Sequence, residues 1–519
     1  MNKTVSRPGI MISGVFFLAG LCLTFWLTAQ YGMGVTHDTV AYMHASRSLL
    51  AGCGLEFFGY NSPYIQWAPL YPALLALFEL SGIGMLAGAR LFGALCFGLT
   101  LGLVSYFMYR RFAHKTLVFP AMAVIMLCPW MLKVNVFAWT EASFILFIVL
   151  PLFFIDAYAR EGKFRYVALA GVFSALCCLD RYTGVILVIS IVIMLIFCPG
   201  RISKRIKAVL AYGAISGLPI GAWLVRNILL TGTLLGLRLP SPYPLDTNIM
   251  RVFSVLAGWF IPTSRHINFL ADGMLTPAGI LFTALFAFLM ICAVITLAVI
   301  AVKRRKLQNS PLTYVLIMLI FVVITSVNLV ISATNILSEP IGDRYMLPVL
   351  VPLVIILFGL LDYAAGRLRR GVLMYMVVIF SVIWSFFPAA SGVYFISETV
   401  RSGPGGYTAP WYPDRALVSL IPKEDLDGGT LLISNRAAAV YGVTGVRTFS
   451  QPKKEGFDDY TLSAFERLLK GADRAVLVWF DGTDEANVYS LMELSQLFDL
   501  ELIARSNMGG IYTISVLKY

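Results

Sequence analysis

The sequence predicts a polytopic α-helical membrane protein that ends in a small α/β domain. Hydrophobic residues make up 59% of the 519 positions and charged residues only 13%, with a mean hydropathy of +0.80, which is outside the range of ordinary soluble chains. The apolar residues form runs of about 20, the length that crosses a bilayer as a helix. After residue 391 the long runs give way to turn residues and short mixed segments.

About eleven apolar runs are candidate spans. They cover residues 9–30, 86–109, 116–133, 141–158, 166–180, 184–198, 208–229, 274–302, 312–333, 345–362 and 372–391. As a single helix, residues 166–198 would extend roughly 50 Å at about 1.5 Å per residue, against a hydrocarbon core of ~30 Å. A hairpin turn at Asp180-Arg181-Tyr182-Thr183-Gly184 divides this run into two spans and takes its charges out of the bilayer.

Two apolar segments need separate arguments. Residues 9–30 follow a basic start, as in a signal peptide, but no small-residue cleavage site ends the run, so we interpret it as a retained first span. Segment 67–83 is apolar enough to cross, yet a span there would invert every later loop. We expect it to be an interfacial or re-entrant helix on the outer face, with Pro69 and Pro72 at its entry turn.

Six basic clusters set the orientation of the spans. They are Lys3 with Arg7; Arg110, Arg111 and Lys115; Arg160, Lys163 and Arg165; Arg201, Lys204, Arg205 and Lys207; Lys303-Arg304-Arg305-Lys306; and Arg367, Arg369 and Arg370. Cytoplasmic loops collect Lys and Arg, and eleven spans with the N-terminus inside put every cluster in the cytoplasm. Topology therefore explains the net charge of +12 without a nucleic-acid partner.

The same orientation divides the chain into a membrane domain, residues 1–391, and an extracytoplasmic α/β domain, residues 392–519. The membrane domain has long outer loops at 31–85 and 230–273. In the second domain we predict strands at Leu431–Ser434 and Ala475–Phe480, helices at Tyr460–Lys470 and Ala486–Phe498, and a terminal strand pair at Leu500–Arg505 and Ile511–Leu517. This domain has no glycine-rich phosphate loop and no histidine, so we expect it to support the membrane domain or dock an acceptor.

We expect a location in the cell inner (plasma) membrane, with the N-terminus cytoplasmic and the C-terminal domain periplasmic or extracellular. A compact N-terminus and the lack of an ER-retention signal favour a bacterial cell. The eight cysteines show no metal-ligand spacing and seven fall in apolar runs, so we predict neither a disulfide framework nor a metal centre.

A second set of polar residues lies at the opposite, outer ends of the spans. It comprises His37, Asp38, Tyr42, Glu141, Arg181, Tyr182, Arg226, Asn227, Asp343, Arg344 and Tyr345. A carboxylate such as Asp38 can accept a proton from a hydroxyl or hold a divalent cation. The same residue type also caps helices, and one follows Asp38; the dipole of a helix start likewise accounts for Glu141. As the two acids of the outer face, Asp38 and Glu141 are the candidate catalytic residues. Candidate substrate contacts are His37, Tyr42, Tyr182, Asn227, Asp343 and Tyr345.

Three of these residues, Arg181, Arg226 and Arg344, suit a lipid phosphate, because the planar guanidinium donates two parallel hydrogen bonds to phosphate oxygens. Each arginine alone is explained by snorkelling or by local pairing, Arg181 with Asp180 and Arg344 with Asp343. Their concentration on one face, against the positive-inside bias, favours a phosphate site.

An ordered series of short motifs resembles the GT-C polytopic glycosyltransferases, especially the branch that contains the protein O-mannosyltransferases and the lipid A aminoarabinose transferases. The motifs are Asp38-Thr39-Val40-Ala41-Tyr42, Leu49-Leu50-Ala51-Gly52, Pro69-Leu70-Tyr71-Pro72, Thr140-Glu141, Arg181-Tyr182-Thr183-Gly184, Arg226-Asn227 with Thr231-Gly232-Thr233, and Asp343-Arg344-Tyr345 with Pro348. They extend through most of residues 1–390.

The resemblance implies a polyprenyl-phosphate sugar donor and an inverting transfer in which the aspartate of the first outer loop, here Asp38, acts as base. The acceptor can be a lipid, a glycan or a protein. Many protein O-mannosyltransferases have a glutamate directly after this aspartate, where this chain has Thr39, which weighs against protein mannosylation. Oligosaccharyltransferase relatives use an acidic pair with a metal; Asp38 has no such partner, which weighs against a divalent cation.

The residues alone leave two other classes of function open, a transporter and a ligase. A glycolipid transporter or flippase usually places ionisable groups near the bilayer midplane, where these runs have almost none. A lipid-glycan ligase of another membrane fold could use the outer loop 230–273, which carries Arg238, Arg251, Arg265 and His266.

Overall fold

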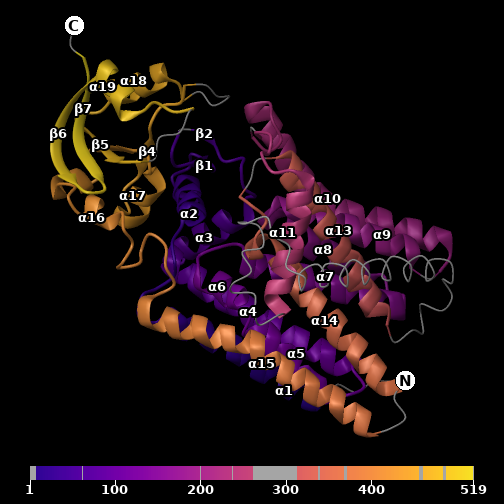
Figure 1. Ribbon diagram of the computed structural model, residues 1–519. Coiled ribbons are helices and arrows are strands. Elements are labelled where there is room, and N and C mark those ends of the chain that lie inside the picture. The colour runs from indigo at the N-terminus through magenta and orange to yellow at the C-terminus, as the bar shows by residue number, and fades with distance from the viewer. Residues whose placement is uncertain are drawn as a thin grey trace. The chain divides into compact units, whose positions relative to one another are not determined.

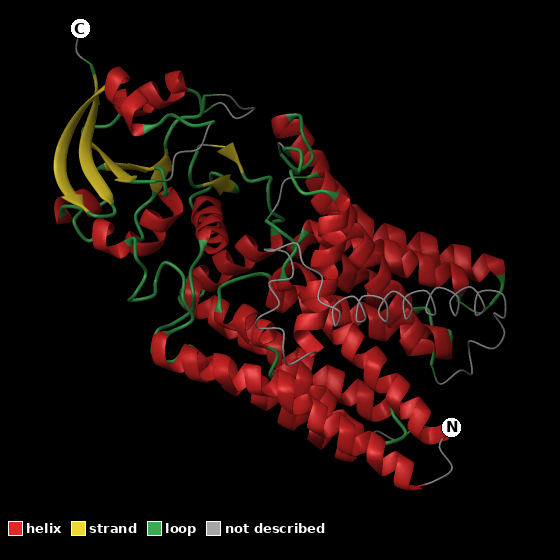
Figure 2. Ribbon diagram, viewed as in Figure 1, coloured by secondary structure: helices red, strands yellow, loops and turns green. Residues whose placement is uncertain are grey.

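The computed structural model describes residues 7–60, 62–198, 200–236, 238–260, 312–336, 339–367, 371–454, 460–482 and 487–517. Most of these residues are helical (Figure 2). They form two compact units. The first unit comprises Met1–Trp26, Leu91–Asn135 and Thr140–Glu398; the second comprises Leu27–Arg90, Val136–Trp139 and Thr399–Tyr519.

Seven helices of the described residues are long and apolar enough to cross a membrane. They are α1 (Arg7–Leu27), α4 (Met85–Arg111), α7 (Glu141–Glu161), α10 (Ile202–Thr231), α13 (Thr313–Asn335), α14 (Asp343–Arg367) and α15 (Gly371–Ser402). An eighth crossing is made by α5 (Val118–Met126) and α6 (Pro129–Val136) if this bent pair is one span; the bend is 55°. The chain is thus a multi-pass membrane protein (Figure 1).

The predicted hairpin is present as α8 (Arg165–Asp180) and α9 (Val185–Phe197), joined by a short 3-10 turn at Tyr182–Gly184. Nine predicted spans coincide with one helix each, and span 116–133 coincides with the bent pair of α5 and α6. Span 274–302 lies outside the described residues, as do Arg265, His266 and the cluster Lys303–Lys306. The total of eleven spans stays a sequence prediction.

The core of the first unit is built around α7, which is buried along most of its length and packs against α8, α13 and α14. A helix that is apolar all round buries itself among other helices in this way. Helix α10 is joined to α8 by a buried hydrogen bond, in which the Tyr212 hydroxyl of α10 donates to Ser174 Oγ of α8 at 2.7 Å. Helix α14 packs on α7, and both helices begin with charged residues, Asp343 and Glu141.

The second unit contains the first outer loop, with α2 (His37–Leu50), α3 (Leu70–Leu80) and the two-residue strands β1 (Glu56–Phe57) and β2 (Ser62–Pro63). Helix α3 is ~16 Å long, too short to span, in line with the expectation for segment 67–83. It packs against α2, where Ser46 Oγ donates to the Pro72 carbonyl at 2.8 Å and the rings of Tyr42 and Tyr71 lie 5.1 Å apart.

The remainder of the second unit is a five-stranded sheet of order β4-β3-β5-β7-β6. Its strands are β3 (Leu431–Ser434), β4 (Thr448–Ser450), β5 (Ala475–Phe480), β6 (Phe498–Ser506) and β7 (Gly509–Val516). β3 pairs parallel with β4 and β5, whereas β7 pairs antiparallel with β5 and β6. The predicted α/β domain with a terminal strand pair is confirmed.

Helices cover both faces of this sheet (Figure 1). They are α16 (Arg415–Val418), α17 (Ala437–Thr444), α18 (Leu462–Lys470) and α19 (Leu491–Leu497). Phe465 and Leu494 pack on one face with Leu477, and Leu417 and Val440 pack on the other with Val476. Burial on both faces explains why β5 is a continuous apolar run.

The first outer loop and the C-terminal region, which the sequence assigned to different domains, belong to this one compact unit. The backbone N–H of Ser450 in β4 donates to the Gly59 carbonyl at 3.1 Å, and the rings of Tyr60 and Tyr460 lie 4.6 Å apart. Helix α15 also continues unbroken through residue 391.

Candidate active site

Three of the predicted site residues meet in the first unit. Glu141 Oε1, at the start of α7, accepts from Arg181 Nη1 and from Arg344 Nε, each at 2.6 Å. Arg181 Nη1 also donates to Thr140 Oγ1 at 3.0 Å. The Glu141 side chain is only 3% exposed, whereas the side chains of Arg181 and Arg344 are 22% and 16% exposed. One carboxylate between two arginines leaves a net charge of +1.

The position of Arg181 is set by the turn between α8 and α9. Its backbone N–H donates to the Cys177 carbonyl at 3.0 Å, and its own carbonyl accepts from Gly184 N–H at 2.8 Å. The neighbouring Asp180 is buried and its Oδ2 accepts from Ser143 Oγ of α7 at 2.8 Å. This bond holds the end of α8 beside the first turn of α7, so Arg181 and Glu141 are brought together by their neighbours.

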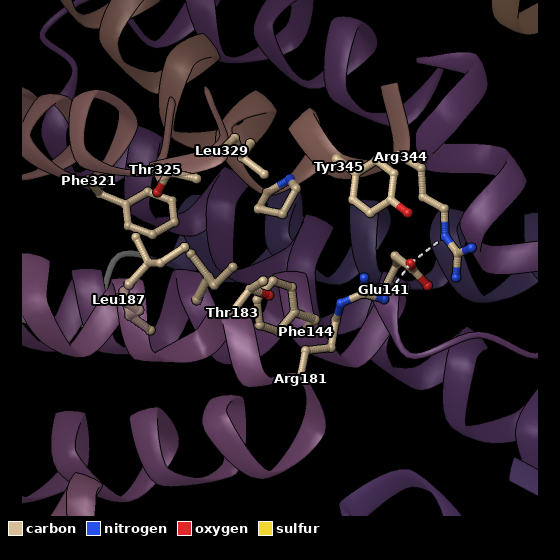
Figure 3. Close-up of a pocket in the computed structure, with 13 residues that line it drawn as sticks. Glu141, Phe144, Arg181, Thr183, Leu187, Phe321, Thr325, Leu329, Arg344 and Tyr345 are labelled. Atoms are coloured by element: carbon tan, nitrogen blue, oxygen red, sulfur yellow. Dashed lines mark hydrogen bonds and ion pairs between the residues drawn. The ribbon is translucent and has the colours of Figure 1, made fainter. Parts of the chain in front are cut away.

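Glu141, Arg181 and Arg344 line one end of a cavity of about 70 Å³ (Figure 3). The rest of the wall is mainly apolar, and comes from α7, α9, α13 and α14. It consists of Phe144, Ile148, Thr183, Ile186, Leu187, Phe321, Thr325, Leu329, Tyr345 and Pro348. In the view of Figure 3, Phe321, Thr325 and Leu187 lie at one side and the ionic group at the other.

Two polar atoms of this wall, Glu141 Oε2 and Thr325 Oγ1, are buried and have no hydrogen-bond partner among the described residues. Buried polar atoms normally have partners, so these two are available to a ligand or to water. The cavity therefore combines a cationic end with an apolar length, which suits an anionic head on a hydrocarbon chain.

Arg226 does not line this cavity. Its guanidinium lies 4.4 Å from the centre of the Trp223 ring and donates to Asn227 Oδ1 at 3.1 Å. Asn227 in turn donates to the Tyr182 hydroxyl at 3.4 Å, and Trp223 Nε1 donates to the same hydroxyl at 2.9 Å. These contacts tie the end of α10 to the residue that follows Arg181.

The remaining predicted residues of α14 anchor its first turn. Asp343 Oδ1 accepts from Trp259 Nε1 at 2.7 Å, which ties α14 to α11 (Leu245–Phe260), a helix within the outer loop 230–273. The Tyr345 hydroxyl donates to Glu339 at 3.3 Å, and Tyr345 also lines the cavity. Asp343 is therefore engaged with a tryptophan from another helix.

Asp38 lies in the second unit, in the first turn of α2. The N-cap of this helix is Thr36, which forms a capping box with Thr39, so Asp38 is not the capping residue. Trp139 Nε1 donates to Thr36 Oγ1 at 2.8 Å and fixes the helix start. Burial, with the charges of Asp414 and Asp38, raises the pKa of the Tyr407 phenol to about 12.

His37 and Tyr42 flank Asp38 differently. The His37 side chain is exposed, and its ring lies 5.5 Å from Phe58 and 5.9 Å from Trp67. Tyr42 is buried, with 2% exposure, against Tyr71. Of the two, His37 is open to a ligand from solvent.

Sequence reasoning missed several residues of the cavity, namely Phe144, Leu187, Phe321, Thr325 and Leu329. In the sequence they are ordinary members of apolar runs, and only helix packing shows which face lines a cavity. Among the described residues, no group of three or more His, Cys, Asp or Glu side chains could hold a metal ion.

Comparison with known proteins gives one family match and several structural matches. The family described as dolichyl-phosphate-mannose-protein mannosyltransferase matches residues 66–223. The crystal structure of ArnT from Cupriavidus metallidurans bound to undecaprenyl phosphate matches with a TM-score of 0.62 at 13% identity, over 98% of this chain and 98% of that chain. The apo state of ArnT gives 0.61 at 13% identity, over 96% and 97%.

The archaeal oligosaccharyltransferase AglB from Archaeoglobus fulgidus is more distant, with a TM-score of 0.49 at 12% identity over 90% of this chain and 69% of that chain. No curated protein matches the sequence. The chain thus has the fold of ArnT along nearly its whole length, and part of it matches a mannosyltransferase family. This confirms the resemblance to the GT-C polytopic glycosyltransferases that the motifs indicated.

Proposed function

We propose that this protein is an integral-membrane glycosyltransferase that moves a sugar from a polyprenyl-phosphate donor to an acceptor hydroxyl on the extracytoplasmic face. The observation that carries the proposal is the meeting of Arg181 and Arg344 on Glu141 at one end of an apolar cavity. The fold of ArnT, which has been crystallised with undecaprenyl phosphate, supports the donor class. The proposed location and orientation are those predicted from the sequence. The protein lies in the cell inner (plasma) membrane, with its C-terminal domain on the extracytoplasmic side.

In this proposal Arg181 and Arg344 hold the donor phosphate. The phosphate is the leaving group, so negative charge grows on its bridging oxygen as the bond to the anomeric carbon breaks. Guanidinium groups fixed beside that oxygen stabilise the charge without reorganising. Glu141 acts as a positioning residue, because its Oε1 is already shared between the two arginines. Arg226, held against Trp223, orients the Tyr182 region instead of contacting phosphate.

Asp38 is the proposed base. It accepts the proton of the acceptor hydroxyl, whose oxygen then bonds to the anomeric carbon on the side opposite the departing phosphate, which inverts that centre. His37, exposed and in contact with Phe58 and Trp67, is the proposed acceptor contact. In this proposal the step uses neither a glutamate directly after Asp38 nor a metal ion.

The experiment compares co-purified lipid in the wild type, Arg344→Ala, Arg181→Ala and Asp38→Asn by native mass spectrometry. We expect polyprenyl phosphate in the wild type, loss of about 90% of it in both arginine variants, and normal retention without sugar transfer in Asp38→Asn. Arg165→Ala, which removes an exposed arginine at the other end of α8, is the matched control. Full transferase activity in Asp38→Asn would overturn the base assignment, and unchanged lipid in the arginine variants would overturn the phosphate site.

The fold also bears on the two rival functions. The ligase alternative required another membrane fold, whereas this chain has the fold of ArnT. A transporter would retain the donor lipid but leave it unreacted in every protein, the wild type included, so sugar transfer by the wild type that is lost in Asp38→Asn separates the transferase from the transporter.

A further inference from the structure

A second cavity, of about 250 Å³, lies in the first unit, at the far ends of the helices that build the candidate site. It is lined by Arg111, Phe112, Ala113, Leu312, Tyr314, Gly359, Asp362, Tyr363 and Gly366. Along α14, residues 343 and 362 are separated by about 28 Å of helix, close to the ~30 Å of a hydrocarbon core. The two cavities therefore lie near opposite ends of α14, and the lining of the second includes Arg111, from a basic cluster that the sequence predicts to be cytoplasmic.

The ionic group beside this second cavity repeats the pattern of the first. Asp156, near the end of α7 and fully buried, pairs with Arg111 and, at 2.9 Å, with Arg160. Its Oδ1 has no hydrogen-bond partner among the described residues. As at Glu141, one carboxylate between two arginines leaves a charge of +1.

The other carboxylate of the cavity, Asp362, has donors of its own. Its oxygens accept from the backbone N–H groups of Ala113 and His114, at 2.8 and 2.7 Å, and from His114 Nδ1 at 2.9 Å. These bonds direct the Asp362 carboxylate to the turn between α4 and α5, which it holds. Arg110, at the end of α4, and Lys115 flank the same turn and add two positive charges to it.

Exposed apolar side chains lie on two of the helices near this cavity, α14 and α5. Leu360, next to Gly359 on α14, is 44% exposed, and Phe119 of α5 is 53% exposed, as expected for side chains that face lipid. A cationic pocket between spans, bordered by lipid-facing residues, fits an anionic headgroup whose acyl chains stay in the bilayer.

We propose that this cavity binds the phosphate group of an anionic phospholipid, with the Arg111 guanidinium as its principal donor and Tyr314 in its wall. The Arg111 side chain, 14% exposed, reaches the cavity while its Cζ lies 5.3 and 5.9 Å from the ring centres of Phe107 and Tyr314. These rings hold the guanidinium at the mouth, so little side-chain freedom is lost when phosphate binds. The site is independent of the transferase proposal, because it shares no residue with the cavity at Glu141.

The test places the full-length protein in phosphatidylcholine nanodiscs with a rising fraction of phosphatidylglycerol and counts retained lipids by native mass spectrometry. We expect the wild type to retain phosphatidylglycerol about tenfold better than phosphatidylcholine, and Arg111→Ala to lose that preference. Arg165→Ala, which removes an exposed arginine that lines neither cavity, is the matched control and keeps it. A third arm adds millimolar inorganic phosphate: persistence of the bound lipid supports a headgroup site, and full displacement assigns the site to free phosphate and overturns the lipid assignment.

A second variant guards against misfolding of Arg111→Ala, which leaves Asp156 with fewer partners. Gly366 lines the cavity on α14, and a Cβ there would come no nearer than 3.8 Å to His114. Gly366→Leu therefore fills the cavity from a position that tolerates a side chain, and we expect the same loss of phosphatidylglycerol preference at an unchanged thermal midpoint. Equal retention of the two lipids by the wild type, or an unchanged preference in both variants, would contradict the site.

Discussion

At the scale of single residues, the candidate site depends on one buried carboxylate. Glu141 bonds two guanidinium groups that come from 40 and 203 residues away in the sequence. Without it, two positive charges would share one end of an apolar cavity, where low polarity strengthens their repulsion. Glu141 therefore holds both arginine side chains at this end of the cavity before any anion has bound.

This role predicts a specific phenotype for Glu141→Gln. The substitution keeps the size of the side chain but removes its charge, and we expect the free energy of unfolding to fall by roughly 3 kcal/mol, as when one partner of a buried ion pair is removed. Added polyprenyl phosphate should raise the thermal midpoint of the variant more than that of the wild type, because the phosphate supplies the missing counter-charge. Equal shifts for the two proteins would contradict the counter-charge role of Glu141, and no shift in either would show that no phosphate reaches the arginines.

At the scale of elements, the tight turn between α8 and α9 sets where Arg181 points. A Cβ on Gly184 would lie 2.6 Å from the carbonyl carbon and oxygen of Cys177. That carbonyl accepts the backbone N–H of Arg181, so a side chain at 184 must shift the backbone that carries the arginine.

We therefore predict that Gly184→Ala lowers stability by about 1–3 kcal/mol and reduces retained polyprenyl phosphate as Arg181→Ala does. The matched control is Gly213→Ala on α10, where nothing lies within 4 Å of the added Cβ and alanine favours the helix. Thermal unfolding and native mass spectrometry of both variants check the prediction. A Gly184→Ala protein that retains normal amounts of lipid would show that the turn does not control the arginine.

The elements also show where the sequence was informative. Length and charge predicted the α8–α9 hairpin, and apolar runs gave β3 and β5 with their observed bounds. The predicted helix from 486 to 498 begins later, at Leu491, because Ser490 caps it by accepting from Glu493 N–H at 3.3 Å. The missed elements α17 and β4 are short, and a three-residue strand such as Thr448–Ser450 has no periodicity to detect.

At the scale of the whole molecule, the ordered motifs contain Glu141, Arg181 and Arg344, which meet in the structure, but they did not predict how these residues pair. Local pairing suggested Asp180 for Arg181 and Asp343 for Arg344. In the structure both arginines bond Glu141, while Ser143 and Trp259 donate to the two aspartates. Pairing between distant helices depends on how they pack, and a single sequence holds no record of which faces meet.

The orientation of the chain yields the last prediction, since every external assignment depends on it. Cys53, just after α2, is exposed, whereas the other described cysteines are buried except Cys22 in the first span. Maleimides react with the thiolate, which does not form in hydrocarbon, so a membrane-impermeant maleimide should label Cys53 from the outer side only. Cys292, outside the described residues, is replaced by serine throughout.

A matched probe for the other face is Lys163→Cys in a Cys53→Ser background. Lys163 is 56% exposed in the turn between α7 and α8, within a cluster that the sequence places in the cytoplasm. We expect Cys53 to be labelled in spheroplasts, and Lys163→Cys only in inside-out vesicles. The reverse pattern would invert the topology and move the ionic group at Glu141 to the cytoplasmic face, where the donor proposal would have to draw its lipid from the inner leaflet.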